Sequence, residues 1–277
     1  MDYQFVKKLH GYTATVELVS SQGVLWVKKE AIPEEIYNEI YFHKEVHPSL
    51  KLIYEPDINP SIFFVEYLSD TRSLQENITP ENFYLWGKAV AHIHSHIYLN
   101  PQRMDEQGIL YTLVWGEYIQ GDFLEGIERQ SRKKTDITSK QIEIFRNLVT
   151  PLKGLSPKSV LLHCDLHTGN VLLQNDEAFI IDKGSSLIAG DSLYDLALIS
   201  LSYPSSHLNI SLNQWDKEII KKNTELMDAF MEGYGVSYID TSHEVFMRYV
   251  ALRLLGRYPN PFESNLRPLI ESITGQY

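Results

Sequence analysis

The chain of 277 residues has almost no cysteine and no long apolar segment. Cys164 is the single cysteine, so an internal disulfide is excluded, and the cytosol is a compatible redox compartment. No apolar run approaches the roughly eighteen residues that a membrane-spanning helix needs. The N-terminal segment MDYQFVKKLHGYTA also lacks the apolar region of a signal peptide. We therefore expect a soluble, cytoplasmic protein without a membrane partner.

Positive charge is also scarce. The chain holds 25 Lys and Arg against 36 Asp and Glu, which gives a formal net charge of −11 at pH 7. Nucleic-acid binding needs a basic surface that neutralises phosphates, so nucleic acid is not expected as a main partner. An acidic surface favours solubility and can attract cationic small molecules, although net charge alone places no site.

Strand-like segments come first in the chain. A composition of 43% hydrophobic and 22% charged residues is typical of a globular protein. Residues 14–20 and 24–30 are rich in β-branched side chains, and the intervening SQG predicts a hairpin. Pro33 then predicts a helix start. Two further strands are expected within residues 51–56 and 61–68.

Helical patterns dominate the rest of the chain. The tripeptide TPE at 79–81 predicts a helix start, and apolar residues follow at three- and four-residue spacing over 83–97. Strand-like runs interrupt the helices at 160–181. The sequence therefore predicts an α+β fold with two lobes, a small β-rich lobe at 1–68 and a larger, mostly helical lobe at 69–277.

Three oxygen-bearing side chains follow strand-like runs in the segment VLLHCDLHTGNVLLQNDEAFIIDKGSS. They are Asp165, Asn170 and Asp182. Phosphoryl transfer to a hydroxyl needs a carboxylate that accepts or orients the proton, and hard oxygen ligands that hold Mg²⁺ against the phosphates. Strand ends are rigid supports for such groups. The pattern G-x-x-x-x-G-K-[ST] is absent, which excludes a P-loop site.

The segment HCDLHTGN followed by IID resembles the catalytic loop and metal-binding strand of the aminoglycoside phosphotransferase and choline kinase superfamily. The family pattern is H-x-D-x-x-x-x-N followed by I-D, and its fixed positions are filled by His163, Asp165, Asn170 and Asp182. The runs GDSLYDLA and WGKAVAHIHS are similar to two further family motifs, so the resemblance spans roughly residues 11–197. It implies a protein-kinase-like bilobal fold, with a nucleotide-binding N-terminal lobe and a C-terminal lobe for catalysis and acceptor binding.

The resemblance implies roles for individual residues of the C-terminal lobe. Asp165 would be the catalytic aspartate, and Asn170 and Asp182 would be the ligands of Mg²⁺. His163 and Asp195 would support the catalytic loop without touching the substrate. The implied cofactors are ATP, or GTP, and Mg²⁺.

Residues of the N-terminal lobe would bind the nucleotide. Lys28, at the end of VLWVK, matches the strand lysine that contacts ATP phosphates. Lys29 competes with it, because strand alternation lets only one of the two face the cleft. We prefer Lys28, because Trp26 would share its face and stack on adenine. Glu39 is expected as the ion-pair partner of that lysine, with Glu35 as the second candidate.

Two further nucleotide-binding features follow from the resemblance. The segment FVEYL is similar to the family's linker, whose backbone binds the adenine edge, which points to Glu66 and Leu68. The expected phosphate-covering loop between Leu9 and Val16 contains one glycine, Gly11. Its backbone amides can still bind phosphate, but reduced flexibility leaves the nucleotide affinity open.

Our interpretation is an ATP- and Mg²⁺-dependent kinase that phosphorylates a hydroxyl of a small molecule, as a monomer or homodimer. The resemblance favours an aminoglycoside-like or other cationic acceptor, with choline, a sugar or homoserine as alternatives. Acidic residues of the poorly matched helical segments are the candidates for binding such a cation: Asp122, Glu125, Glu128, Asp228 and Glu232.

Two interpretations from other classes stay open. The glycine-poor loop is compatible with a non-catalytic nucleotide-binding protein on a kinase fold, although the intact Asp165, Asn170 and Asp182 argue against it. A zinc enzyme is the other, because the run HIHSH contains three histidines. On the predicted helix, however, His92 and His96 share a face and His94 points elsewhere.

Overall fold

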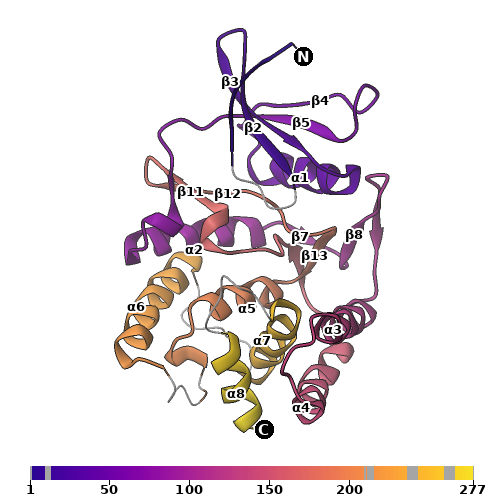
Figure 1. Ribbon diagram of the computed structural model, residues 1–277, viewed down its shortest axis with the longest axis vertical. Helices are drawn as coiled ribbons and strands as arrows, with labels where there is room; N and C mark the ends of the chain where they lie inside the picture. The colour runs from indigo at the N-terminus through magenta and orange to yellow at the C-terminus, as the bar shows by residue number, and fades with distance from the viewer. Residues whose placement is uncertain are drawn as a thin grey trace.

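The structure, a computed structural model, describes residues 2–9, 14–208, 210, 215–235, 243–258 and 266–276. Its N-terminal part, at the top of Figure 1, is a five-stranded antiparallel sheet of order β1-β2-β3-β5-β4 with one helix. These elements are β1 (Gln4–Lys8), β2 (Thr15–Ser21), β3 (Val24–Glu30), α1 (Pro33–Val46), β4 (Leu52–Tyr54) and β5 (Ile62–Glu66).

Local sequence signals account for the beginning of this part. Gln22 and Gly23 have φ angles of 52° and 80°, and Ser21 pairs directly with Val24. This is a two-residue hairpin turn, whose twist suits two antiparallel strands. Helix α1 begins at Pro33, whose fixed φ suits the first helical position. The predicted hairpin and helix start are thus confirmed.

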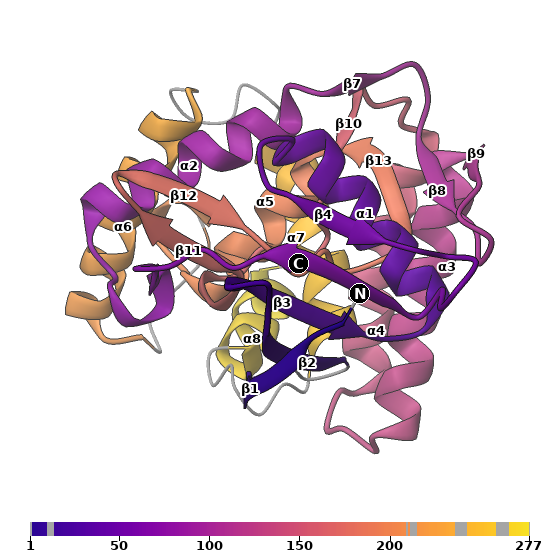
Figure 2. The same ribbon diagram turned by 90° about the horizontal axis from the view of Figure 1, so that it is seen from above.

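The C-terminal part is mainly helical. Its helices are α2 (Pro80–His94), α3 (Trp115–Arg132), α4 (Ser139–Val149), α5 (Ser192–Ser202), α6 (Lys217–Tyr234), α7 (His243–Arg257) and α8 (Leu266–Gln276). Seen from above, α2 and α6 lie on one side of the molecule and α3 and α4 on the other (Figure 2). None of the described helices is both long and apolar enough to cross a membrane.

Two small antiparallel sheets lie between the helices and the N-terminal sheet. One has the order β7-β10-β13-β8-β9 and the other β12-β11-β6. The strands are β6 (Arg72–Ser73), β7 (Ile97–Tyr98), β8 (Gln102–Met104), β9 (Leu110–Thr112), β10 (Ser159–Leu161), β11 (Val171–Gln174), β12 (Glu177–Ile180) and β13 (Leu187–Asp191). Short 3₁₀ turns are η1 (Leu74–Glu76), η2 (Thr150–Gly154), η3 (Thr168–Asn170) and η4 (Ser206–Leu208).

Helix α2 begins where the sequence predicts but ends earlier. The Thr79 hydroxyl accepts a hydrogen bond from the Asn82 amide at 3.3 Å, and Pro80 is the first helical residue. The helix ends at His94 because the following residues pair with β10, so Ile97 lies in β7 and is 62% exposed. The buried face of the helix consists of Phe83, Trp86, Val90 and Ile93.

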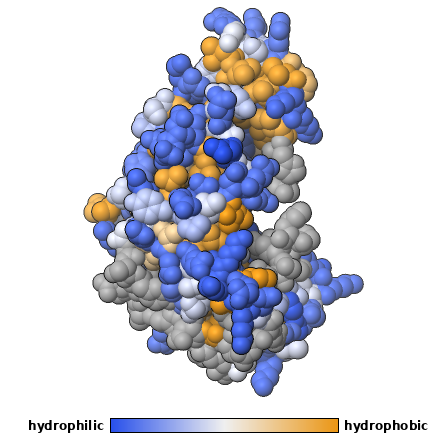
Figure 3. Space-filling model, turned by 90° about the vertical axis from the view of Figure 1, so that its left-hand side faces the viewer, coloured by the Kyte–Doolittle hydropathy of each residue, from blue (hydrophilic) through white to orange (hydrophobic). Residues whose placement is uncertain are grey.

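The largest hydrophobic core belongs to the C-terminal part, and two smaller clusters lie on the N-terminal sheet. Figure 3 shows apolar side chains gathered at the top of one face, over that sheet, and a mainly hydrophilic surface below. The sheet ends with β5 at Glu66, whereas β6 pairs with β11. The predicted division into residues 1–68 and 69–277 falls between these two strands and stays a prediction.

Candidate active site

The loop after β10 is fixed by hydrogen bonds from its backbone to a buried carboxylate. Asp195 accepts from the amides of His163 and Cys164, each at 2.7 Å. The Nε2 of His94 lies 3.4 Å from the same carboxylate. Burial tends to raise the Asp195 pKa, but these partners outweigh it and the pKa is lowered. Asp195 thus holds the turn of the loop, where Cys164 has a φ of 71°.

His163 ties this loop to the next one. Its Nε2 donates to the carbonyl of Ile181 at 2.8 Å, and its Nδ1 accepts from the Asp165 amide at 3.2 Å. Complete burial lowers the pKa of His163, so the ring is neutral and can fill both roles at once. His163 therefore orients Asp165 through a backbone hydrogen bond and acts as a neutral ring.

Asp165 presents its carboxylate beside two basic side chains. Its Oδ1 lies 2.6 Å from Nη1 of Arg257, and its Oδ2 lies 3.6 Å from Nε2 of His167. Burial opposes ionisation, but His167 and Arg257 outweigh it and lower the pKa of Asp165. A Cβ at Gly184 would lie 2.4 Å from the Asp165 Cβ, so glycine is needed at that position. The group is an ionised carboxylate at neutral pH.

Asn170 and Asp182 supply oxygen atoms next to this carboxylate. The Asn170 amide nitrogen donates to the backbone carbonyl of Asp165 at 3.0 Å, which leaves its side-chain oxygen for another partner. Asp182 follows β12 and has a φ of 58°. Carboxylate and amide oxygens are ligands that Mg²⁺ prefers. The donor set therefore fits a hard cation that takes its remaining ligands from phosphates and water.

Lys29, and not Lys28, reaches this group. Its ammonium lies 2.7 Å from Glu39 and 2.6 Å from Asp182. Lys28 points to the opposite face of β3, where it pairs with Glu17 at 3.1 Å. The expectation of a Lys28–Glu39 pair is therefore wrong. The two lysines do lie on opposite faces of β3, as strand alternation requires, but the face that carries Lys29 is the one turned toward Glu39 and Asp182.

Trp26 shares the face of Lys28 and is consequently also misplaced in our prediction. It is buried and packs with Val19 and Phe64 on the outer side of the sheet. It is not among the residues that line either cavity described below. Trp26 is a core residue and provides no adenine platform.

The remaining predicted nucleotide-binding residues lie at the edge of this region. The Glu66 amide bonds to the carbonyl of Lys51 at 2.9 Å, and its side chain lies 3.4 Å from the Lys51 ammonium. The carbonyl of Leu68 lies 3.4 Å from the Thr71 hydroxyl. Adenine binding by Glu66 and Leu68 stays a prediction. Glu35 lines the smaller cavity described next, and Gly11 lies outside the described residues.

Two cavities meet at Asp165. One of about 410 Å³ is lined by Lys29, Glu39, Asn170 and Asp182, among others. The other, of about 690 Å³, lies between the loop that carries Asp165, α3 and α7. The two share Asp165 and the three residues from Gly184 to Ser186. This arrangement allows two different ligands to approach one carboxylate from two sides.

The five acidic candidates for acceptor binding separate into two groups. Asp122 and Glu125, on α3, line the larger cavity. Glu128 points away from it and pairs with Arg132 at 3.9 Å. The remaining two, Asp228 and Glu232, lie on α6, which packs against α2, and do not line the cavity. Three of the five candidates therefore do not line the larger cavity.

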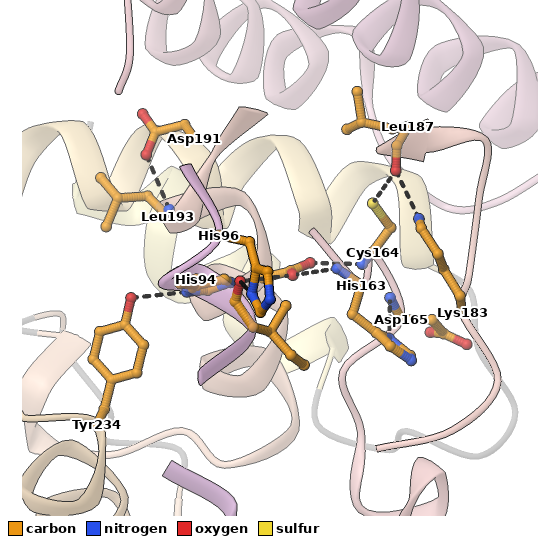
Figure 4. Close-up of polar contacts among 12 residues, drawn as sticks. His94, His96, His163, Cys164, Asp165, Lys183, Leu187, Asp191, Leu193 and Tyr234 are labelled. Carbon is orange, nitrogen blue, oxygen red and sulfur yellow. Dashed lines mark hydrogen bonds and ion pairs between the residues drawn. The ribbon is translucent and has the colours of Figure 1, made fainter. Parts of the chain in front are cut away.

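Several basic residues of the site were missed in the sequence. The larger cavity is lined by Arg103, Arg129, Arg253 and Arg257. Lys183, next to Asp182, is buried and donates to the carbonyl of Ser185 at 2.8 Å. It also donates to the carbonyl of Leu187 at 2.7 Å (Figure 4). Burial lowers its pKa. The spacing of Arg253 and Arg257, four apart on α7, was the one signal in the sequence that these two residues share a helix face.

The histidines of HIHSH do not form a metal site. The rings of His92 and His96 lie edge to face, with centroids 5.1 Å apart. His94 points the other way, toward Asp195 and the hydroxyl of Tyr234 at 2.8 Å. Within the described part of the chain, no group of three or more His, Cys, Asp or Glu gathers as a metal site. The zinc-enzyme interpretation has no support here.

Comparison with known families identifies the class. The family model described as the phosphotransferase enzyme family matches residues 60–235, and the chain belongs to this family. Its class is therefore that of the phosphotransferase enzymes. The EKC/KEOPS complex subunit BUD32 of Debaryomyces hansenii is 29% identical over 130 residues, which cover 42% of this chain and 50% of that protein. The chain thus spans about half the length of the curated relative it matches.

Solved structures of similar shape support the protein-kinase-like fold. The apo form of a thermostable mutant of aminoglycoside phosphotransferase APH(4)-Ia has a TM-score of 0.65 at 14% identity, covering 100% of this chain and 94% of that one. A putative fructosamine-3-kinase from Thermobifida fusca gives 0.61 at 14%, covering 100% and 94%. Choline kinase LicA from Streptococcus pneumoniae gives 0.59 at 16%, covering 100% and 95%. At such identities the likeness shows the fold alone.

Proposed function

We propose that the chain is a kinase that transfers the γ-phosphoryl group of ATP, or GTP, to a hydroxyl of a small molecule. The position of Asp165 supports this most directly, because it lines both the cavity beside Lys29, Asn170 and Asp182 and the larger cavity beyond it. A nucleotide in the first cavity and an acceptor in the second would meet at this carboxylate. A related fold, aminoglycoside phosphotransferase APH(4)-Ia, has been crystallised with ADP and hygromycin B.

The transfer breaks the bond between the γ-phosphorus and the oxygen that leaves with ADP. The acceptor oxygen bonds to that phosphorus, and the hydroxyl proton passes to Asp165, so the products are ADP and a phosphate ester. A lowered pKa keeps Asp165 ionised and able to orient the hydroxyl. Asp195 and His163 would act indirectly, because they hold the loop that carries Asp165.

Residues of the smaller cavity would bind the triphosphate. Lys29 would contact the phosphates that are not transferred, while Glu39 fixes the position of its ammonium. Asn170 and Asp182 would hold Mg²⁺, which when bound neutralises charge on the phosphate oxygens. The ammonium of Lys29 also lies against Asp182, so Lys29, Glu39 and Asp182 form one network of charges.

The acceptor is proposed at the level of a hydroxyl compound of small size. A cationic acceptor, expected from the sequence, is supported by Asp122 and Glu125 on the wall of the larger cavity. Choline-, sugar- and homoserine-type acceptors undergo the same chemistry. The four arginines of that wall give no support to a polycation, because they would repel it.

An ADP-release assay over aminoglycosides, amino alcohols, sugars and hydroxy acids tests the proposal. The Asp165→Asn variant should lower kcat by about 10²–10⁴-fold, because the proton acceptor is lost. Its affinity for MgADP should remain. A non-catalytic nucleotide-binding protein would instead bind MgADP without any acceptor-dependent turnover. Equal turnover by wild type and variant would contradict the role of Asp165.

A further inference from the structure

The larger cavity contains arginines from three separate elements. Arg103 comes from β8, Arg129 from α3, and Arg253 and Arg257 from α7. Two of them have carboxylate partners: Arg103 lies 3.9 Å from Glu34, and Arg257 lies 2.6 Å from Asp165. The other two, Arg129 and Arg253, form no ion pair with any carboxylate of the described residues.

Arg253 is bound by neutral groups only. Its guanidinium donates to the Tyr194 hydroxyl and to the Cys164 carbonyl, each at 2.6 Å, and its Cζ lies 4.1 Å from the Tyr194 ring centroid. Its Nε is shielded from solvent and has no hydrogen-bond partner. The Asp122 carboxylate accepts from Tyr194 at 3.0 Å instead. Burial raises the pKa of Asp122 and Arg253 opposes this shift, so the two groups interact electrostatically although no ion pair joins them.

Arg129 of α3 lines the same cavity and is half-buried. It lies in the last turn of α3, and its Nε is shielded from solvent without a partner. An arginine is always charged, and a guanidinium removed from water is costly unless an anion or a full set of acceptors surrounds it. Arg253 and Arg129 line one cavity without a carboxylate partner among the described residues, so this wall suits an anionic ligand.

We propose that the acceptor carries an anionic group, a carboxylate or a phosphate monoester, which binds to Arg253 and Arg129 while its hydroxyl faces Asp165. This inference rests on the proposed kinase function. Planar guanidinium groups bind both kinds of anion through paired hydrogen bonds. The carboxylates of Glu117 and Glu125 on the same wall allow an amine on the same acceptor, as in a hydroxy amino acid. An aminoglycoside, which carries amines and no acid, leaves both arginines without a counter-ion.

The first test compares acceptors that differ by one acid group. Serine is set against ethanolamine and glucuronate against glucose, with kanamycin as the polycation, in an ADP-release assay. We expect turnover with the acid-bearing member of a pair and little with its partner. Preferred turnover of ethanolamine, glucose or kanamycin overturns the inference and leaves the kinase function standing. Absence of both nucleotide binding and turnover contradicts the kinase function itself.

The second test uses variants and needs no known acceptor. Binding of inorganic phosphate is measured by calorimetry with MgADP present, so that the nucleotide cavity is filled. Arg129→Gln should weaken this binding by about tenfold or more, since a charge-assisted hydrogen bond is lost. The matched control is Arg132→Gln, which changes an arginine on the same helix that is exposed, pairs with Glu128 and does not line the cavity.

The outcomes of the second test decide the inference in each case. Loss of phosphate binding in Arg129→Gln, with retention in Arg132→Gln, supports the inference. Once an active acceptor is known, Arg129→Gln should raise the KM for that acceptor and leave the KM for ATP unchanged. Equal phosphate affinity in the two variants, or no phosphate binding by the wild type, overturns it. Arg253→Lys keeps the charge and removes the paired geometry, so it should weaken binding while the melting temperature verifies folding.

Discussion

Lys28 and Lys29 are neighbours in sequence and lie on opposite faces of β3. Lys29 contacts Glu39 and Asp182, whereas Lys28 contacts Glu17 and Glu30. Burial disfavours the charged form of Lys29, but the two carboxylates outweigh it and raise the pKa. Lys29 is therefore a fixed cation directed at the proposed phosphate position, and Lys28 is a cation of the outer sheet surface.

Substitution of the two lysines separates these roles. Lys29→Met keeps the apolar stem and removes the charge, so kcat/KM for ATP should fall about 10²–10³-fold, the usual effect of losing one preorganised donor. Lys28→Met should change it only a few-fold. Steady-state kinetics with varied ATP decide the matter. A larger loss in Lys28→Met would restore the assignment first made from the sequence.

The sequence predicts the site residues of the segment 163–182 because their pattern is local, and their roles stay predictions, whereas their distant partners could not be predicted. Asp165 and Asn170 lie five positions apart, in a short segment whose resemblance to a family motif implies their roles. The choice between the lysines depends on Asp182, 153 positions away from Lys29. Likewise Arg257 meets Asp165 across 92 positions. Periodicity carries no information on such contacts, so the arginines of the larger cavity were missed.

At the scale of elements, α2 and α6 approach each other through two glycines. A Cβ at Gly87 would lie 2.0 Å from the carbonyl oxygen of Phe230, and one at Gly233 would lie 2.0 Å from that of Tyr84. Contact between backbones at this distance leaves no space for a methyl group. The buried rings of Trp86 and Phe230 fill the remaining interface, with centroids 5.2 Å apart.

Gly87→Ala should therefore destabilise the fold, although alanine is the better helix former. We expect a loss of about 1–3 kcal/mol in the free energy of unfolding, because the helices must move apart. The matched control is Gly121→Ala in α3, where an added Cβ meets nothing within 4 Å. It should stabilise by about 0.5–1 kcal/mol. Urea unfolding measures the free energy of unfolding of both variants. Equal changes of the same sign in Gly87→Ala and Gly121→Ala would contradict the close contact between α2 and α6.

Strong local signals predicted the longer elements, and weak ones left the short strands unassigned. The cap at Thr79 and the proline at position 80 define the start of α2, and the SQG turn defines the β2–β3 hairpin. Strands of two or three residues, such as β6 and β7, show no period of their own. They exist because β11 and β10 supply a partner strand, which is a tertiary effect.

His47 connects the end of α1 to β12 by one buried hydrogen bond. Its Nε2 lies 2.9 Å from the Ile180 carbonyl, two residues before Asp182. Burial lowers the pKa of His47 to about 4, with the bond to Ile180 opposing the shift. In the unfolded chain its pKa is about 6.5, so below that pH the unfolded state binds a proton that the folded state does not.

Stability should consequently fall as pH drops through this window. For His47 alone the loss between pH 7 and pH 5 is about 2 kcal/mol, because protonation favours the unfolded state until the pH reaches the folded pKa. His47→Gln keeps a hydrogen-bond donor and removes the titration, so its loss over the same interval should be smaller by about that amount. Urea unfolding at the two pH values measures the difference. Identical pH dependence in wild type and variant would show that His47 is not buried as a neutral ring.

At the scale of the whole molecule, the N-terminal part meets the helical part through Phe42 and Val46 of α1, which pack into the large core, and through a few polar contacts. Lys29 of β3 bonds to Asp182, and His47 after α1 bonds to Ile180. Both contacts end on the segment that follows β11. A nucleotide with its metal would lie at this junction and contact both parts, so its binding should stabilise the entire fold and not one part of it.

Metal and nucleotide should act together on the melting temperature. At a ligand concentration near 100 times Kd, MgADP should add about 2.7 kcal/mol, which raises Tm by roughly 5 °C or more. ADP with EDTA should give a smaller rise. Asp182→Asn weakens the proposed metal ligand at constant size, so it should remove the difference between the two conditions. The control is Asp176→Asn in the exposed β11–β12 turn, where asparagine also tolerates the left-handed backbone, φ 61°. If the difference in Tm between MgADP and ADP with EDTA is unchanged in Asp182→Asn, the metal does not bind at Asp182. If this difference is lost in Asp182→Asn and kept in Asp176→Asn, the metal binds at the junction of the two parts.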